Sequence, residues 1–318
     1  MPPLHPRCRC TISYREMPLT APSIGGNVQP NSSTISPLSV PPAGENLNTT
    51  FPAVNNTFAA KTIKEANEFA IKILGVPNAE YKGCAIEVAN EWNAGLLEAF
   101  GKFPELKKRF GFVGEAHERN AAYQQALIAE YTKILQAARP NLSMAVANEI
   151  AKRQAVKKIA EILPIQKDDI SQSWISNKGI SKQFSGVVVN KIYAENLSFF
   201  LSTLEQSVIN KIRPIGCVTV HSALDHEIAH QLDALLGLRN MPEVQDLFDS
   251  RVTVKNGTED FSRITAELSR YACDNRNTNR YAEFIAEAWA EYCNNPAPRE
   301  IAKKLGEIVE REYTKKFG

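Results

Sequence analysis

The chain has 318 residues, of which 43% are hydrophobic and 23% charged, the composition of a globular protein that can bury a substantial core. Its 37 basic and 35 acidic residues leave a net charge of +2, which gives no electrostatic reason to expect a nucleic acid or a membrane as partner. No stretch approaches the roughly 18 apolar residues of a spanning helix, and the N-terminus lacks the apolar stretch of a secretory signal. We therefore expect a soluble protein that is cytoplasmic when it is made.

The N-terminal part of the chain does not show the pattern of a folded domain. Residues 13–57 are rich in Pro, Ser, Thr, Asn and Gly and have almost no apolar periodicity. Such a segment cannot bury enough surface to offset the entropy lost on ordering. We interpret residues 13–57 as a disordered linker that joins residues 1–12 to everything after about residue 58.

Beyond this linker the apolar residues recur at spacings of three and four, which is the period of an amphipathic helix. The stretch 184–193 is instead β-branched and bounded by Gly186, so it is predicted to be a strand. The fold class is therefore α+β and mainly helical, with residues 58–183 forming a helical subdomain that carries no assignable chemistry. Helices are predicted at 59–75, 84–101, 116–138, 143–163, 196–212, 219–236, 260–272, 280–294 and 297–316.

The helix predicted at 219–236 carries a metal-binding pattern. His226 and His230 are four residues apart, so both imidazoles lie on one face of a helix and can bind a single metal ion. Glu227 lies beside that pair, where its carboxylate can accept a proton from water that Zn²⁺ has acidified. Two histidines and one base in this spacing are typical of zincin peptidases, which predicts one Zn²⁺ as cofactor.

A catalytic zinc site usually takes three protein ligands and leaves one position open for water. A metzincin would have a third histidine six residues after His230, but Leu236 occupies that position. A gluzincin instead takes a glutamate from a later helix, and Glu283 and Glu287 share one face of the helix predicted at 280–294. One of these carboxylates can bind the metal while the other hydrogen-bonds a ligand imidazole.

The pattern HExxHxxD, followed by Tyr271 and by an E-F-x-A-E run from Glu283 to Glu287, resembles the catalytic domain of lethal-factor-like gluzincins, the family of the anthrax toxin protease. The resemblance covers residues 184–318 and implies a zincin catalytic domain with a small mixed sheet and an active-site helix. It implies Glu283 as the third zinc ligand, Glu287 as a supporting residue and Tyr271 as the group that stabilises the oxyanion. The gap between Tyr271 and Glu283 is longer than in the family, so Tyr281 stays open as the alternative.

Two further hypotheses concern the surroundings of this site. Asp233, one turn beyond His230, is interpreted either as a residue that orients a ligand or as a helix-surface carboxylate. Zincins commonly hold an extended substrate antiparallel to an edge strand beside the active-site helix, which makes a protein or peptide the expected partner. The predicted strand is therefore interpreted either as that substrate edge strand or as a structural strand, with the residues Val187, Val188, Val189 and Asn190.

Residues 1–12, with the sequence MPPLHPRCRCTI, look like the closing motif of Mu-F-type phage minor head (head morphogenesis) proteins. Such head proteins are sometimes fused to toxin or effector domains, which implies a phage- or prophage-encoded effector. Phage head components would then be further partners, and the protein would be virion-associated or delivered to a target cell. His5, Cys8 and Cys10 fall short of the four ligands of a structural zinc site, so we expect no metal at this end.

The sequence thus predicts a zinc-dependent endopeptidase in which Glu227 acts as general base and then as proton donor to the leaving amine. One alternative is a phage head structural or adaptor protein with a degenerate, non-catalytic zincin fold, although the intact Glu227 speaks against it. Another is a binding module in which the helices of residues 58–183 recognise a partner.

Overall fold

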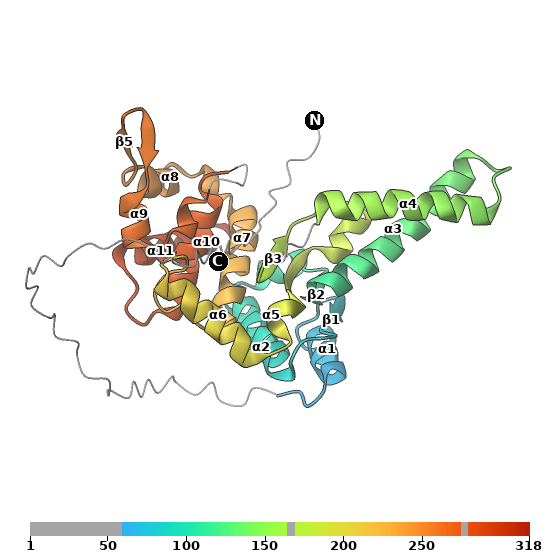
Figure 1. Cartoon of the computed structure of the whole chain (residues 1–318), viewed down its shortest axis with the longest axis horizontal. Coiled ribbons are helices and arrows are strands. Elements are labelled where there is room, and N and C mark those ends of the chain that lie inside the picture. The colour runs from blue at the N-terminus through green and yellow to red at the C-terminus, as the bar shows by residue number, and fades with distance from the viewer. Residues whose placement is uncertain (1–58, 164–168, 275–278) are drawn as a thin grey trace, which may run out of the picture. The chain divides into compact units, whose positions relative to one another are not determined.

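The computed structural model describes residues 59–163, 169–274 and 279–318, and every structural statement below concerns these residues. They belong to one compact unit (Figure 1). The predicted head-protein motif at 1–12 and the predicted linker at 13–57 lie outside the described residues.

The fold is mainly helical with a small mixed sheet, which confirms the predicted α+β class. The strands are β1 (Asn78–Glu80), β2 (Phe112–Glu115), β3 (Ser171–Trp174) and β4 (Gly186–Val189), and a separate hairpin is made by β5 (Thr253–Lys255) and β6 (Thr258–Asp260). The helices are α1 (Ile63–Lys72), α2 (Ile86–Lys102), α3 (Ala116–Ala138), α4 (Met144–Ile162), α5 (Lys191–Ala194), α6 (Leu197–Ile209), α7 (Val220–Leu236), α8 (Pro242–Asp249), α9 (Ser262–Glu267), α10 (Ala282–Asn294) and α11 (Glu300–Phe317).

The predicted helices are confirmed, with small differences at their ends. The helix predicted at 260–272 is split into α9 and a short 3-10 turn at Tyr271–Cys273. Helix α8 and the β5–β6 hairpin were not predicted. The predicted strand at 184–193 is shorter, because the side chain of Asn190 accepts a hydrogen bond from the backbone N–H of Ile192 and caps the short helix α5.

The four-stranded sheet has the order β1-β2-β4-β3, in which β3 runs antiparallel to β4 and the other pairs are parallel. Strand β4 is therefore an interior strand, paired with β2 on one side and with β3 on the other. The interpretation of Val187, Val188, Val189 and Asn190 as a substrate edge strand is wrong. The edge strand on that side of the sheet is β3, which the sequence analysis did not predict.

Side chains of β4 alternate between two hydrophobic cores, as the period of two of a strand requires. Val187 and Val189 point into the larger core, which α2, α7 and α10 also fill. Val188 points into a smaller core beneath the α3–α4 helix pair. Helices thus cover both faces of the sheet, and α7 lies on one face with α3 and α4 on the other (Figure 1).

The predicted division between a helical subdomain at 58–183 and a catalytic domain at 184–318 is wrong. Strands β1, β2 and β3 come from the first segment and β4 from the second, yet they form one sheet. The larger core is also shared, since Trp92 and Leu96 of α2 pack in it with Ile228 and Leu232 of α7. Residues 59–318 therefore fold around common cores rather than as two domains.

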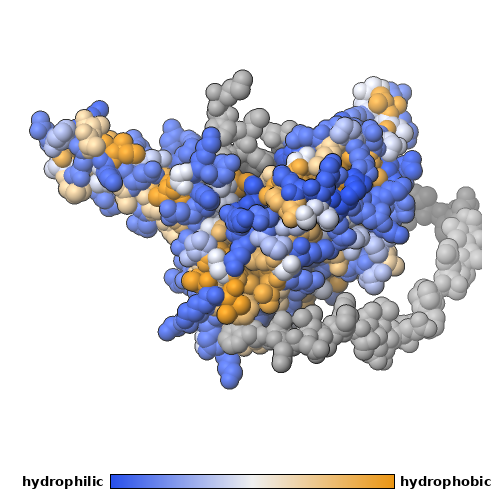
Figure 2. Space-filling view, turned by 180° about the vertical axis from the view of Figure 1, so that it is seen from behind, coloured by the Kyte–Doolittle hydropathy of each residue, from blue (hydrophilic) through white to orange (hydrophobic). Residues whose placement is uncertain are grey.

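The surface is mostly hydrophilic on the face shown in Figure 2, with hydrophobic residues gathered at a few places. Among the described helices, none combines the length and the hydropathy that crossing a lipid bilayer requires. Large hydrophobic side chains that are well exposed come from different elements, among them Ile73, Met144, Ile209, Ile215 and Val254.

The close approach of β1 and β2 generates a prediction about Gly114. Its φ is +130°, and a Cβ atom at this position would lie 2.0 Å from the carbonyl oxygen of Glu80. Gly114→Ala should therefore lower the free energy of unfolding by more than about 2 kcal/mol, measured by urea denaturation. The control is Gly101→Ala near the end of α2, where a Cβ meets nothing within 4 Å and stability should rise by up to about 1 kcal/mol. Wild-type stability of Gly114→Ala would contradict the pairing of these strands.

Candidate metal centre

Helix α7 carries His226 and His230 and is capped at both ends. It begins at a capping box in which the side chains of Thr219 and Ser222 each accept a hydrogen bond from the backbone N–H of the other residue. It ends at Gly237, whose φ of +79° is the left-handed conformation that glycine adopts without strain. His226 and His230 are both buried in the middle of this helix, so their imidazoles are constrained on every side.

Helix α10 packs against α7 and brings two glutamates to the histidines (Figure 1). Oε2 of Glu283 lies 3.3 Å from Nε2 of His226 and 3.7 Å from Nε2 of His230. The two Nε2 atoms are 3.3 Å apart. The predicted convergence of His226, His230 and Glu283 is therefore present, with all three ligand atoms within 4.8 Å of one another.

This donor set fits a zinc ion in size and in chemistry. Tetrahedral zinc with bonds of about 2.0–2.1 Å holds neighbouring ligand atoms about 3.3 Å apart, close to the separations found here. Two imidazoles and one carboxylate are also the ligands of many catalytic zinc sites. Burial, with a smaller contribution from His226, holds the pKa of His230 well below its usual value, so this imidazole is neutral, the form that binds a metal.

Glu287 contacts one of the two histidines. Its Oε1 lies 2.9 Å from Nδ1 of His226, which directs Nε2 of the same ring toward Glu283. Its Oε2 accepts a hydrogen bond of 2.7 Å from the hydroxyl of Ser269, which itself accepts one from the backbone N–H of Ala272. Ser269 was missed by the sequence analysis, although it lies only two residues before Tyr271.

Glu227 is fully buried beside the two histidines. Its Oε1 accepts a hydrogen bond of 2.8 Å from the hydroxyl of Ser171, the first residue of β3. Ser171 was not predicted, because the sequence of β3 has no run of β-branched residues that would indicate a strand. The candidate base is therefore hydrogen-bonded directly to the edge strand of the sheet.

The structure separates the two candidate tyrosines. The ring of Tyr271 lies beside His226, with 5.9 Å between ring centroids, and the residue is largely buried. The hydroxyl of Tyr281 instead donates a hydrogen bond of 2.9 Å to Asp249 at the end of α8. Of the two, Tyr271 is the tyrosine that adjoins the candidate metal ligands.

Asp233 has a different role from either of the two that the sequence suggested. It is buried, so it is not a surface carboxylate. Its two oxygens accept hydrogen bonds from the backbone N–H and from Nε of Arg239, just beyond the end of α7. Asp233 thus stabilises the turn after the helix through Arg239 rather than by orienting a ligand histidine.

The segment before residue 184 also contributes buried polar groups near the candidate site. Arg119 of α3 is fully buried and donates a hydrogen bond of 2.8 Å from Nη2 to the side-chain oxygen of Gln172 in β3. Burial lowers the pKa of Arg119 to about 9, while the nearby carboxylates of Glu115 and Glu227 act in the opposite direction. The guanidinium is still positively charged at neutral pH.

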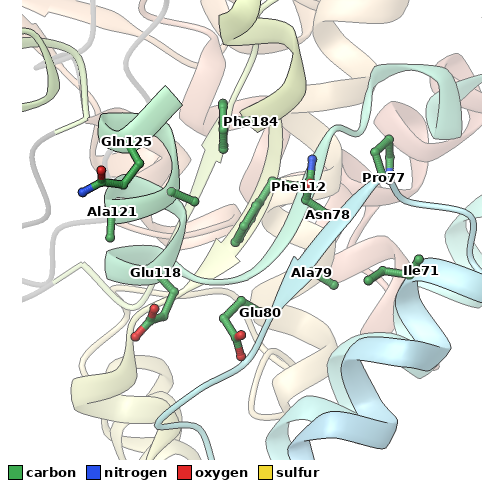
Figure 3. A pocket seen from close by; sticks show the side chains of 11 residues that line it. Ile71, Pro77, Asn78, Ala79, Glu80, Phe112, Glu118, Ala121, Gln125 and Phe184 are labelled. Carbon is green, nitrogen blue, oxygen red and sulfur yellow. The ribbon is translucent and has the colours of Figure 1, made fainter. Parts of the chain in front are cut away.

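A pocket elsewhere on the molecule does not coincide with these residues. It has a volume of about 430 Å³ and lies on the α3 side of the sheet, over β1 and β2 (Figure 3). Its walls are mainly apolar, with the carboxylates of Glu80 and Glu118 at one end. None of the predicted site residues lines it, so this pocket is separate from the candidate metal centre.

The contact between Glu287 and His226 generates the next prediction. Glu287→Ala should raise the dissociation constant for Zn²⁺ by about 10- to 100-fold, because the imidazole loses the partner that fixes its orientation. Competition with a chromophoric chelator measures this constant. Glu307→Ala, which removes an exposed carboxylate from α11, is the control and should bind zinc as the wild type does. Equal zinc affinity in both variants would show that the contact does not support a metal site.

Comparison with known proteins gives no match for this chain among protein-family models, curated proteins or solved structures.

Proposed function

We propose that the protein is a zinc-dependent endopeptidase of the gluzincin type, with a zincin fold. The observation that carries this proposal is the convergence of His226, His230 and Glu283, with Glu227 buried next to them on the same helix. A site that only stabilised the fold would use four protein ligands. Three ligands with an adjacent carboxylate instead favour a site at which water reacts.

Bound Zn²⁺ would polarise the substrate carbonyl and acidify a water molecule. Glu227 accepts the proton of the attacking water and then delivers it to the leaving amine. Glu287 keeps Nε2 of His226 directed into the centre through its contact with Nδ1. Tyr271, whose ring adjoins His226, donates from its hydroxyl to the oxyanion that develops on the substrate.

The peptide substrate pairs with β3 in this proposal. Strand β3 lies at the edge of the sheet, and in the described part of the chain it pairs only with β4. Its first residue, Ser171, contacts Glu227, so the strand passes directly beside the candidate base. An extended peptide bound through main-chain hydrogen bonds to such an edge is held with little side-chain selectivity. The proposed substrates are therefore extended segments of proteins or peptides.

The biological setting belongs to the same proposal. The resemblance of residues 1–12 to the end of phage minor head proteins supports a phage- or prophage-encoded effector. Its substrate would then be a protein of the cell into which the phage head delivers it. The presence of Glu227, which is buried and hydrogen-bonded, speaks against the alternative of a degenerate, non-catalytic fold.

The test is Glu227→Gln, which preserves the size of the side chain and removes its basicity. The variant should keep about one zinc per chain and lose about 10²- to 10⁴-fold in kcat on an unfolded protein substrate such as casein. Zinc is measured by plasma mass spectrometry and cleavage by mass spectrometry of new N-termini. Glu307→Gln on α11 is the control and should remain fully active.

A wild-type protein that binds zinc but cleaves no protein substrate faster than Glu227→Gln would overturn the proposed activity. New N-termini that appear in a cell lysate with wild type and not with Glu227→Gln would identify the substrate.

A further inference from the structure

Two side-chain pairs connect the edge strand β3 to the helix α7. The hydroxyl of Ser171 donates to Oε1 of Glu227 at 2.8 Å. The side-chain amide of Gln231 donates to the hydroxyl of Ser173, also at 2.8 Å. Both pairs are buried, with exposed fractions of 5% or less for all four residues. Buried hydrogen bonds of this kind are costly to leave unmade, so the two elements are fixed to each other.

The spacing of these pairs follows from the geometry of the two elements. Residues two apart on one face of a strand are separated by about 6.7 Å, and residues four apart on a helix rise by about 6 Å. Ser171 and Ser173 can therefore meet Glu227 and Gln231 at the same time when the strand lies alongside the helix. The amide of Gln231 also donates to the carbonyl oxygen of Trp174, which extends the same contact by one residue.

The opposite face of β3 is fixed as well. Gln172 points away from α7 and accepts the hydrogen bond from the buried Arg119 of α3. Movement of the strand would break contacts on both sides. The hydroxyl of Ser171 is consequently a donor at a defined position rather than a mobile side chain.

We propose that Ser171 is a positioning residue for Glu227. A glutamate side chain can take several rotamers, and a fixed hydroxyl donor selects the one that places Oε1 against β3. In the proposed reaction this positioned carboxylate is the group that accepts the proton of the attacking water. This inference rests on the proposed function for the role of Glu227, although the contact itself does not.

The hydrogen bond also connects substrate binding to the base. Ser171 lies on the strand with which the proposed substrate pairs. The same segment of backbone therefore positions both the substrate peptide and the carboxylate of Glu227. A displacement of about 1 Å in such a constellation is enough to reduce the rate substantially. Correct positioning of Glu227 should therefore affect kcat more than KM.

The experiment compares Ser171→Ala with a rescue variant and a matched control in the zinc-loaded, full-length protein. Ser171→Thr keeps the hydroxyl on a residue that strands favour. Ser185→Ala makes the same chemical change at another buried serine, whose hydroxyl donates to the carbonyl oxygen of Trp174 at 3.0 Å. Ser185 thus also contacts β3, but it does not contact Glu227.

Ser171→Ala should lower kcat by about 10- to 100-fold on a protein substrate while KM and zinc content stay within twofold of wild type. Ser171→Thr should recover most of this loss, and Ser185→Ala should show no comparable fall in kcat. A Ser171→Ala enzyme with wild-type kcat, or a loss shared equally by Ser185→Ala, would overturn the inference.

Crystal structures of the zinc-loaded wild type, Ser171→Ala and Ser185→Ala provide a readout that does not require activity. We expect one rotamer of Glu227 in the wild type and in Ser185→Ala. In Ser171→Ala we expect the carboxylate to be displaced or to occupy two rotamers. An unmoved Glu227 in Ser171→Ala contradicts the positioning role even if the enzyme is active. A displaced Glu227 in a protein that cleaves nothing supports that role while the proposed activity fails, so the two failures are distinguishable.

Discussion

The packing of α10 against α7 is the interaction on which the rest of the centre depends. It buries Glu283 and Glu287 next to His226 and His230, with exposed fractions of 2% or less for all four side chains. Burial of two carboxylates among imidazoles is costly unless positive charge and hydrogen bonds compensate for it. Ser269 supplies one of these hydrogen bonds to Glu287. A divalent cation between the converging donor atoms would supply the positive charge.

The same packing explains why the proposed chemistry involves parts of the chain that lie far apart in sequence. In the centre that we propose, helix α7 provides two ligands and the base, and α10 provides the third ligand and the neighbouring Glu287. Strand β3 comes from the segment before residue 184, and its Ser171 donates a hydrogen bond to the candidate base Glu227. The helices and strands of residues 59–183 are therefore part of the catalytic unit that we propose rather than a separate binding module.

Sequence periodicity was sufficient to predict the long helices and to place the candidate ligand residues on shared helix faces. The spacing of four between His226 and His230, and between Glu283 and Glu287, is a local property of a helix, so the shared faces follow directly from the sequence. That the two faces meet was inferred from the resemblance to gluzincins, and the distances in the structure agree with it. The choice between Tyr271 and Tyr281 needed the structure, because it depends on the partner of each side chain.

The pairing of strands in the sheet could not be predicted from the local sequence pattern. The strand β3 reads Ser-Gln-Ser-Trp, with no run of β-branched residues, and its existence depends on pairing with β4. Whether β4 is an edge or an interior strand likewise depends on neighbours that are distant in sequence, which is why residues 187–190 were misassigned. Single hydroxyls such as Ser171 and Ser269 carry no spacing signal at all. They become recognisable only when their carboxylate partners are located.

The central claim is that His226, His230 and Glu283 hold one zinc ion, and X-ray absorption at the zinc edge of the purified wild type tests it most directly. We predict about one zinc per chain, with nitrogen and oxygen ligands at about 2.0–2.1 Å and the outer-shell scattering of two imidazoles. Protein that carries no zinc when purified without chelators, or zinc bound by sulfur at about 2.3 Å, would contradict the claim.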